Sequence, residues 1–191
     1  MANRLPIDEW VHQLSSIPER EFTIPRVHEF VRGHAVRPET LAPYMVYSKG
    51  NYTRNLIYKC PLFELMAICW DVGQVSRIHN HAGQSCWMAV PIGRLAVQNY
   101  EVVRMDQAQG HCELKEASRV LMDPSHPTFV DREMPIHSVL NPAEYGQRAT
   151  SLHVYSRPYD RCLVYDLEKR TYGQVPLFYD SEYGKRVAPP A

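Results

Sequence analysis

Two histidines, His79 and His81, stand one residue apart within residues 73–93, which read GQVSRIHNHAGQSCWMAVPIG. Side chains at positions i and i+2 of a β-strand project from the same face, so both imidazoles can reach one ion. Imidazole binds zinc, copper, iron and nickel, so the pair alone does not select the metal. The alternative is a surface strand with two ordinary polar residues.

The residues around the histidine pair favour a metal site. Gly73 and Gly93 bracket apolar, strand-like runs, and the C-terminal half of the chain offers His137, followed four residues later by Asn141. This frame resembles the two motifs of the cupin superfamily, the first written G-x5-H-x-H-x3/4-E-x6-G and the second ending in H-x3-N. The resemblance implies a small β-barrel of the jelly-roll kind.

Cys86 departs from that frame, because it stands where most cupins place a glutamate ligand. Without the carboxylate, His79, His81 and His137 form a neutral triad. A ferrous ion held by three neutral ligands keeps its full positive charge, which suits an anionic thiolate substrate. The alternative is that Cys86 is a small buried hydrophobic residue, as most cysteines are.

A second polar cluster falls on the predicted strand at residues 151–155. Its residues alternate strictly, so Ser151, His153 and Tyr155 share one face while Leu152 and Val154 share the other. Polar groups need partners when they are buried. The face is therefore either exposed to solvent or a hydrogen-bonded relay beside a metal, in which Ser151 orients His153 and His153 orients the phenol of Tyr155.

Residues 6–47 are predicted to form two or three short helices, because apolar side chains recur there at helical spacing between prolines. These apolar residues are Trp10, Val11, Leu14 and Ile17, then Val27, Phe30 and Val31. Short strands separated by Gly, Pro, Asp or Asn follow. They are predicted over residues 63–70, 85–91, 94–103, 112–121, 128–131, 135–140, 151–156, 161–167 and 172–179. We expect one mainly β domain spanning 1–191, a sandwich or small barrel over 48–183 with a helical segment over 1–47 packed against it.

Composition excludes several classes of protein. Lys+Arg and Asp+Glu are both 21, and no stretch interleaves basic with aromatic residues, so we expect no nucleic-acid partner. No apolar run approaches the length of a membrane span, so we expect no membrane association. The five cysteines are odd in number and irregularly spaced, and the polar start MANRLPIDEW has no secretory character. We therefore expect a reducing, cytoplasmic location. We also expect the protein to be a monomer.

Four motifs in order closely resemble those of cysteine dioxygenase, a cupin thiol dioxygenase family. The match runs from about residue 45 to about residue 183, and the combination is far more specific than any single motif. The motifs are YTRN at 52–55, HNHAGQSC at 79–86, IHSVLN at 136–141 and SLHVYSRP at 151–158.

The resemblance implies a role for each matching residue. His79, His81 and His137 would be the ligands of Fe(II). Arg54 would bind the substrate carboxylate through its forked guanidinium, with Tyr52 close to that pocket.

Other matching residues would lie around the iron. Cys86 and Tyr155 match the pair that forms a thioether crosslink in mammalian-type members. Cys162 falls where the family has a cysteine near the cavity entrance, whereas the remaining cysteines are expected to be structural: Cys60, Cys69 and Cys112. Arg157 departs from the Ser-Pro-Pro of mammalian-type enzymes, and is either an ordinary surface charge or a substrate-binding residue that points into the cavity.

The predicted function is that of a non-haem Fe(II) dioxygenase that converts L-cysteine and O2 to cysteine sulfinic acid. Arg54 and Cys86 favour cysteine as the substrate, since related enzymes for 3-mercaptopropionate carry glutamine at the place of Arg54. Arg157 leaves open another small thiol, such as 3-mercaptopropionate or a mercapto-dicarboxylate. A non-catalytic cupin that binds a metal or a small ligand is the alternative from a different class.

Overall fold

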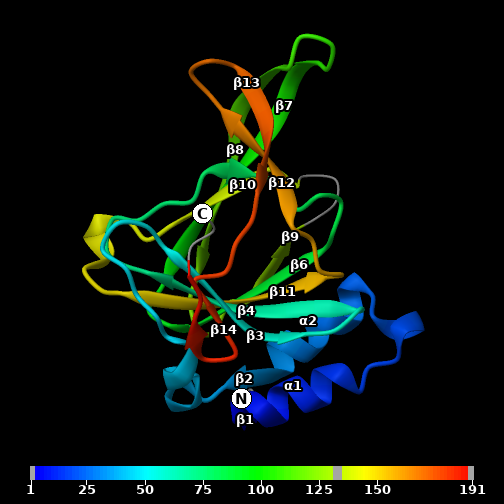
Figure 1. Ribbon diagram of the computed structural model, residues 1–191, viewed down its shortest axis with the longest axis vertical. Helices are drawn as coiled ribbons and strands as arrows, with labels where there is room; N and C mark the ends of the chain where they lie inside the picture. The colour runs from blue at the N-terminus through cyan, green and yellow to red at the C-terminus, as the bar shows by residue number, and fades with distance from the viewer. Residues whose placement is uncertain (1–2, 131–134, 189–191) are drawn as a thin grey trace.

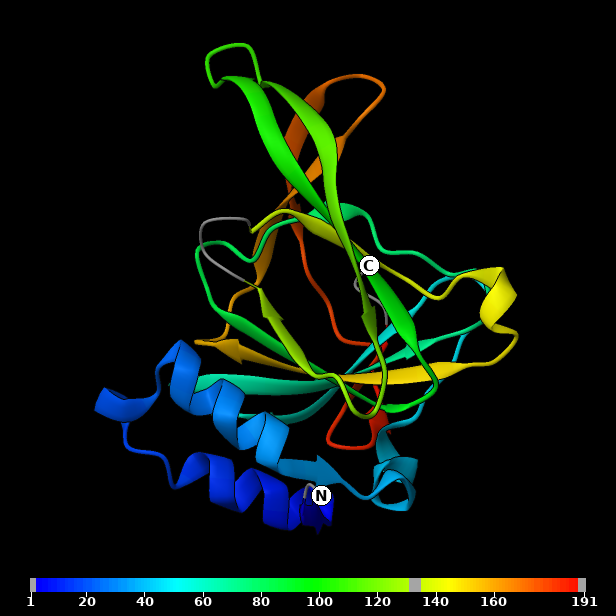
Figure 2. The ribbon, with the colours of Figure 1, turned by 180° about the vertical axis from the view of Figure 1, so that it is seen from behind.

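The computed structural model describes residues 3–130 and 135–188. Most of its strands form a closed barrel and a seven-stranded sheet, which pack against each other. Two α-helices pack below the sheet (Figure 1). The view from behind shows the same layering, with the helices on one side of the sheet and the barrel strands on the other (Figure 2). The predicted mainly β fold, a small barrel with short N-terminal helices, is confirmed.

Helices α1 and α2 form where the apolar spacing predicts them. Their buried residues are Ile7, Trp10 and Leu14 on α1, then Val27, Phe30 and Val31 on α2. The N-terminal elements are β1 (Asn3–Leu5), α1 (Ile7–Ser15), η1 (Glu19–Glu21), α2 (Ile24–Gly33), β2 (His34–Val36) and η2 (Pro38–Tyr44). The parallel pair β1 and β2 was not predicted, because three-residue strands carry too little alternation to detect.

Among the described residues, no helix has the length and apolar character needed to cross a membrane.

The seven-stranded sheet has the order β15-β14-β3-β4-β11-β6-β9. Its strands are β3 (Thr53–Lys59), β4 (Phe63–Trp70), β6 (Cys86–Ile92), β9 (Thr128–Val130), β11 (Ala149–Ser156), β14 (Ser181–Glu182) and β15 (Lys185–Arg186). Strand β4 is buried along its whole length, as expected of a continuous apolar run in the middle of a sheet. Strand β3 was not predicted. The last residue of the strand predicted at 128–131 lies outside the described residues.

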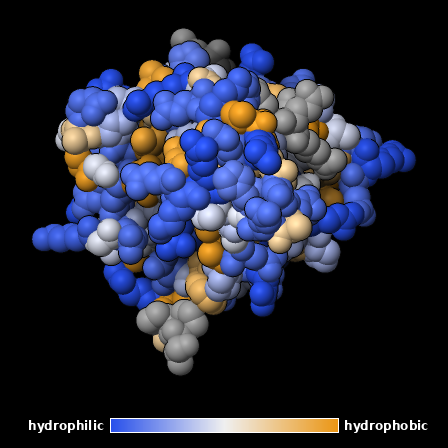
Figure 3. Space-filling view, turned by 90° about the horizontal axis from the view of Figure 1, so that it is seen from above, coloured by the Kyte–Doolittle hydropathy of each residue, from blue (hydrophilic) through white to orange (hydrophobic). Residues whose placement is uncertain are grey.

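The barrel has the order β10-β5-β12-β13-β8-β7. Its strands are β5 (Ile78–His79), β7 (Leu95–Asp106), β8 (His111–Met122), β10 (His137–Leu140), β12 (Arg161–Asp166) and β13 (Thr171–Pro176), and η3 (Ala143–Tyr145) follows β10. The β7–β8 and β12–β13 hairpins extend beyond the rest of the molecule (Figure 1). Seen from their side, the surface is mostly hydrophilic with separate apolar patches (Figure 3).

Strand β11 divides two hydrophobic cores. Leu152 and Val154 pack with residues of α1 and α2, including Trp10 and Val27. Tyr155 points to the other side, into the core inside the barrel. The strict alternation predicted for residues 151–155 therefore places the polar face inside the protein, which excludes the solvent-exposed alternative.

Candidate metal centre and substrate pocket

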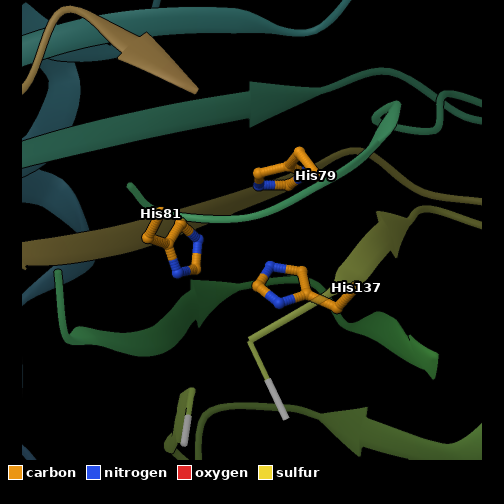
Figure 4. A group of neighbouring side chains, drawn as sticks. All are labelled: His79, His81 and His137. Carbon is orange, nitrogen blue, oxygen red and sulfur yellow. The ribbon is translucent and has the colours of Figure 1, made fainter. Parts of the chain in front are cut away.

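Three histidines from two strands and a loop converge inside the barrel. His79 on β5 lies directly opposite His137 on β10 in an antiparallel pair, and His81 follows His79 by two residues. One nitrogen from each ring lies within 4.8 Å of the others. Figure 4 shows the three rings turned toward a common point. The predicted triad is thus brought together, from positions up to 58 residues apart in the chain.

The protonation of the three rings suits metal binding. Burial lowers the pKa of His79 to about 4, and burial followed by the neighbouring histidines holds the pKa of His81 and His137 well below the ordinary value. The imidazoles are therefore neutral near pH 7, which is the form that binds a metal.

The hydrogen bonds of the three histidines leave ring nitrogens available to bind a metal ion. The Nδ1 of His79 lies 2.8 Å from the carbonyl oxygen of Arg77, which leaves its Nε2 for an ion. The two ring nitrogens of His81 and Nδ1 of His137 are buried without a hydrogen-bond partner in the described chain. Because buried polar atoms normally have partners, these orphaned nitrogens fit a site that holds a metal ion.

A chain of hydrogen bonds runs along β11 beside the triad. The Trp70 indole N–H donates to Ser151 Oγ at 2.9 Å, Ser151 Oγ lies 2.8 Å from His153 Nε2, and His153 Nδ1 lies 3.2 Å from the Tyr155 hydroxyl. These distances make the relay predicted for Ser151, His153 and Tyr155 geometrically possible. Trp70 comes from β4, the neighbouring strand, and its part in the relay was not predicted.

The donors in this relay assign a direction to it. An indole N–H can only donate, so Ser151 accepts from Trp70 and can give its own proton to His153 Nε2. Neutral His153 then carries its proton on Nδ1 and donates it to the Tyr155 oxygen. Burial raises the pKa of Tyr155 well above the ordinary value, so the phenol keeps its proton. The phenol can therefore donate that proton to a partner in the site.

Cys86 and Tyr155 are cross-strand neighbours. Cys86 on β6 pairs with Tyr155 on β11, and both side chains are at most 2% exposed. The Cβ atoms of such pairs are about 4.5–5.5 Å apart, within reach of a direct contact. The Cys86 sulfur also lies 3.9 Å from His153 Nδ1. Burial raises the pKa of the thiol, so an unmodified Cys86 is protonated.

A pocket of about 570 Å³ reaches the triad at His79, which lines it. The lining includes six side chains that could bind or react with a ligand: Tyr52, Arg54, Arg77, His79, Tyr159 and Cys162. Tyr52 stacks on Trp70 with ring centroids 4.6 Å apart, and the Nε of Arg54 is buried without a partner in the described chain. A second hollow of about 640 Å³ lies between the N-terminal segment and β6, and none of the three histidines lines it. The candidate substrate site is therefore the smaller pocket, which His79 and Arg54 line.

Arg157 lies elsewhere, against the interpretation that it binds substrate. Its guanidinium pairs with Glu19 of η1 at 2.9 Å, with the Arg157 side chain 62% exposed, and it does not line the pocket. Its backbone has a φ of 64°, a left-handed conformation that redirects the chain just after β11. Of the two interpretations of Arg157, a surface charge or a substrate-binding residue, the structure therefore favours the surface charge.

Tyr159 and Arg77 are pocket residues that were not predicted from the sequence. Tyr159 packs edge-on against Tyr155, with ring centroids 5.3 Å apart. No periodicity indicates Tyr159, because it follows the turn at Arg157. Arg77 stands two residues before His79, so the same spacing that pairs the histidines also indicates that it shares their face.

The remaining cysteines show no disulfide, since all five thiols are free. Cys162 lines the pocket. Cys69 and Cys112 are buried, and burial raises the pKa of Cys69 to about 11. Neither of these two lines the pocket.

Comparison with known proteins identifies the family of this chain. Residues 6–168 match the family model of cysteine dioxygenase type I. The chain is 26% identical over 168 residues to cysteine dioxygenase type 1 of Homo sapiens, covering 87% of this chain and 82% of the relative. The same protein of Bos taurus is 26% identical over 175 residues, covering 91% and 84%. A Klebsiella pneumoniae structure with a double-stranded β-helix domain aligns with TM-score 0.44 and 14% identity, over 61% of this chain and 81% of that one.

The matched residues 6–168 span both halves of the metal centre and strand β11. The chain belongs to the cysteine dioxygenase type I family and is a thiol dioxygenase.

Proposed function

We propose that the protein is a non-haem Fe(II) enzyme that oxidises small carboxylated thiols, with L-cysteine and O2 giving cysteine sulfinic acid. The observation that carries this proposal is that Arg54 and His79 line one pocket, while the ring centroid of Tyr155 lies 5.4 Å from that of His81. A substrate whose sulfur is at the histidines can therefore place its carboxylate toward Arg54.

His79, His81 and His137 would hold the metal. When bound, Fe(II) supplies the redox chemistry by which O2 oxidises a thiolate. The neutral ligand set leaves the ion's charge uncompensated, so the site favours binding of the substrate as its thiolate.

Arg54 would bind and orient the substrate carboxylate. A guanidinium matches the two oxygens of a carboxylate, and its charge persists at any physiological pH. The buried, unpaired Nε of Arg54 fits a donor that waits for a ligand. Tyr52, stacked on Trp70, forms the adjoining wall of the pocket.

Tyr155 would donate its hydroxyl proton to the bound substrate or to oxygen. The direction of the relay supports this role, because His153 occupies the phenol oxygen as a donor and leaves the phenol proton free. Tyr155→Phe should change both the rate and the ratio of sulfinate formed to O2 consumed. Wild-type values for both would contradict the role.

We also propose a thioether between Cys86 Sγ and the ring of Tyr155. The bond would form with loss of two hydrogen atoms, as O2 oxidises the pair. Their direct cross-strand pairing supports it. Intact mass with peptide mapping would detect the missing hydrogens, and a Cys86→Ser protein supplies the uncrosslinked control.

Metal analysis combined with thiol-dependent O2 uptake tests the proposed function. We expect bound iron, uptake that requires both iron and cysteine, and cysteine sulfinic acid as product. A protein without iron and without uptake with any small thiol would instead be a non-catalytic cupin. Uptake with 3-mercaptopropionate but not cysteine would retain the dioxygenase and change its substrate.

The five free cysteines support a reducing, cytoplasmic setting for this chemistry. We expect the partners to be the small thiol and O2, with the protein acting as a monomer. Sedimentation of the purified protein and its location in fractionated cells test these two expectations.

A further inference from the structure

Arg77 is a second arginine on the pocket that reaches the triad at His79. It stands two residues before His79, and Val75, Arg77 and His79 all line the pocket, as alternation along one extended segment predicts. Arg54 reaches the same pocket from β3. The pocket therefore presents two guanidinium groups from two separate parts of the chain.

The two charges act on the same neighbours. Burial raises the pKa of Tyr52 and of Cys162, and the charges of Arg54 and Arg77 both oppose that rise at each of the two groups. The charges of both guanidinium groups therefore act on Tyr52 and Cys162, which line the same pocket.

Arg77 has no ion-pair partner among residues 3–130 and 135–188. Asp180 is the acidic residue that lines the pocket, and its Oδ2 accepts the backbone N–H of Arg54 at 2.8 Å. Two arginines therefore face one carboxylate that already has a hydrogen bond. The net formal charge of these three groups is +1, and neither guanidinium forms an ion pair with Asp180 among the described residues, so both remain available to bind a carboxylate.

We propose that the pocket also takes small thiols that carry two carboxylates, with Arg54 binding the first and Arg77 the second. This inference rests on the proposed function, since the sulfur must lie at the triad. The reaction remains balanced as R–SH + O2 → R–SO2⁻ + H⁺. Sulfur loses four electrons, O2 gains four, and both oxygen atoms end on sulfur.

Mercaptosuccinate is the probe, because removing one of its carboxylates gives 3-mercaptopropionate. The two compounds share a sulfur, a chain and one carboxylate, so their kcat/KM ratio isolates the second carboxylate. Cysteine is the third substrate, with an ammonium group instead of a second negative charge.

Arg77→Gln is the test variant, because it removes the charge but keeps the backbone carbonyl that contacts His79. We expect it to lower the ratio of kcat/KM for mercaptosuccinate to that for 3-mercaptopropionate by about tenfold, the effect of one charged hydrogen bond. Arg77→Lys should restore part of the ratio. Arg104→Gln removes an exposed arginine on β7 outside the pocket and should leave the ratio as in the wild type.

Anaerobic calorimetry on the iron-loaded protein gives a readout separate from turnover. Mercaptosuccinate should bind more tightly than 3-mercaptopropionate, and Arg77→Gln should weaken only the first by about tenfold. An equal loss for both thiols would show that Arg77 merely attracts anions, and would overturn the proposal. Turnover of cysteine without any of mercaptosuccinate would also overturn it while retaining the proposed function. No turnover of any thiol would instead contradict the proposed function.

Discussion

The hydroxyl of Ser151 connects the relay to the rest of the sheet, so Ser151→Ala tests the relay directly. The Trp70 indole N–H and His153 Nε2 would both lose their partner while buried. Each such group costs about 1–3 kcal/mol, so the loss of both partners should lower the free energy of unfolding by about 2–6 kcal/mol. For a chain of this size, Tm should then fall by about 4–24 °C.

The same substitution should slow turnover. Without Ser151 to hold Nε2, His153 can take the other tautomer or rotate, and Tyr155 loses its oriented donor. A hydrogen bond contributes about 0.5–1.5 kcal/mol, which corresponds to a fall in kcat of about two- to tenfold. Calorimetry measures Tm, and O2 uptake with sulfinate detection measures kcat.

Thr150→Val is the matched control on the same strand. Thr150 is also buried, but its hydroxyl bonds to Tyr47 at 2.6 Å on the side of β11 away from the relay. It should lower Tm and leave kcat as in the wild type, measured well below its Tm. A Ser151→Ala protein with wild-type Tm and wild-type kcat would refute the relay.

Three further predictions concern the substrate, a buried acid and the metal. Arg54→Ala should raise KM for cysteine about ten- to a hundredfold, because a charged hydrogen bond is lost; an unchanged KM would place the carboxylate elsewhere. Burial raises the pKa of Glu64, whose Oε2 accepts the Tyr179 hydroxyl at 2.6 Å. A raised carboxyl pKa stabilises the fold below the unfolded value and loses that stability as pH rises through the folded value. Glu64→Gln should therefore raise Tm at pH 7 relative to the wild type, with the gain disappearing near pH 4; the same gain at both pH values would exclude this cause. Chelation of iron should lower Tm by about 5–10 °C, since ligand at a hundred times its Kd stabilises by about 2.7 kcal/mol; a protein without the three histidines should show no shift.

The histidine triad could be predicted from the sequence because its signals are local. The two-residue period of a strand places His79 and His81 on one face, although β5 ends at His79 and His81 lies in the loop beyond it, and the IHSVLN motif supplied His137. Strand β4 was predicted with its correct bounds, since a short, continuous apolar run between turn residues is typical of a fully buried strand.

The rest of the site depends on which strands become neighbours. Trp70 reaches Ser151 only because β4 pairs with β11 in a register that no local pattern records. The residue types alone leave Arg157 open between a surface charge and a substrate-binding residue, because they do not reveal the left-handed turn that directs it toward Glu19. Arg77 was missed although the period that pairs the histidines applies to it equally.

The pairing of β4 with β11 also has a consequence for how the chain folds. Trp70 and Ser151 are 81 residues apart, whereas β4 meets its other neighbour, β3, through a short turn. Closing so long a loop is slow, and contacts between distant residues form late. During synthesis, His79 and His81 emerge long before β11 exists to complete the wall beside them. We expect a nascent chain to offer an incomplete binding site until β11 has been made, so that iron is retained only by the finished protein.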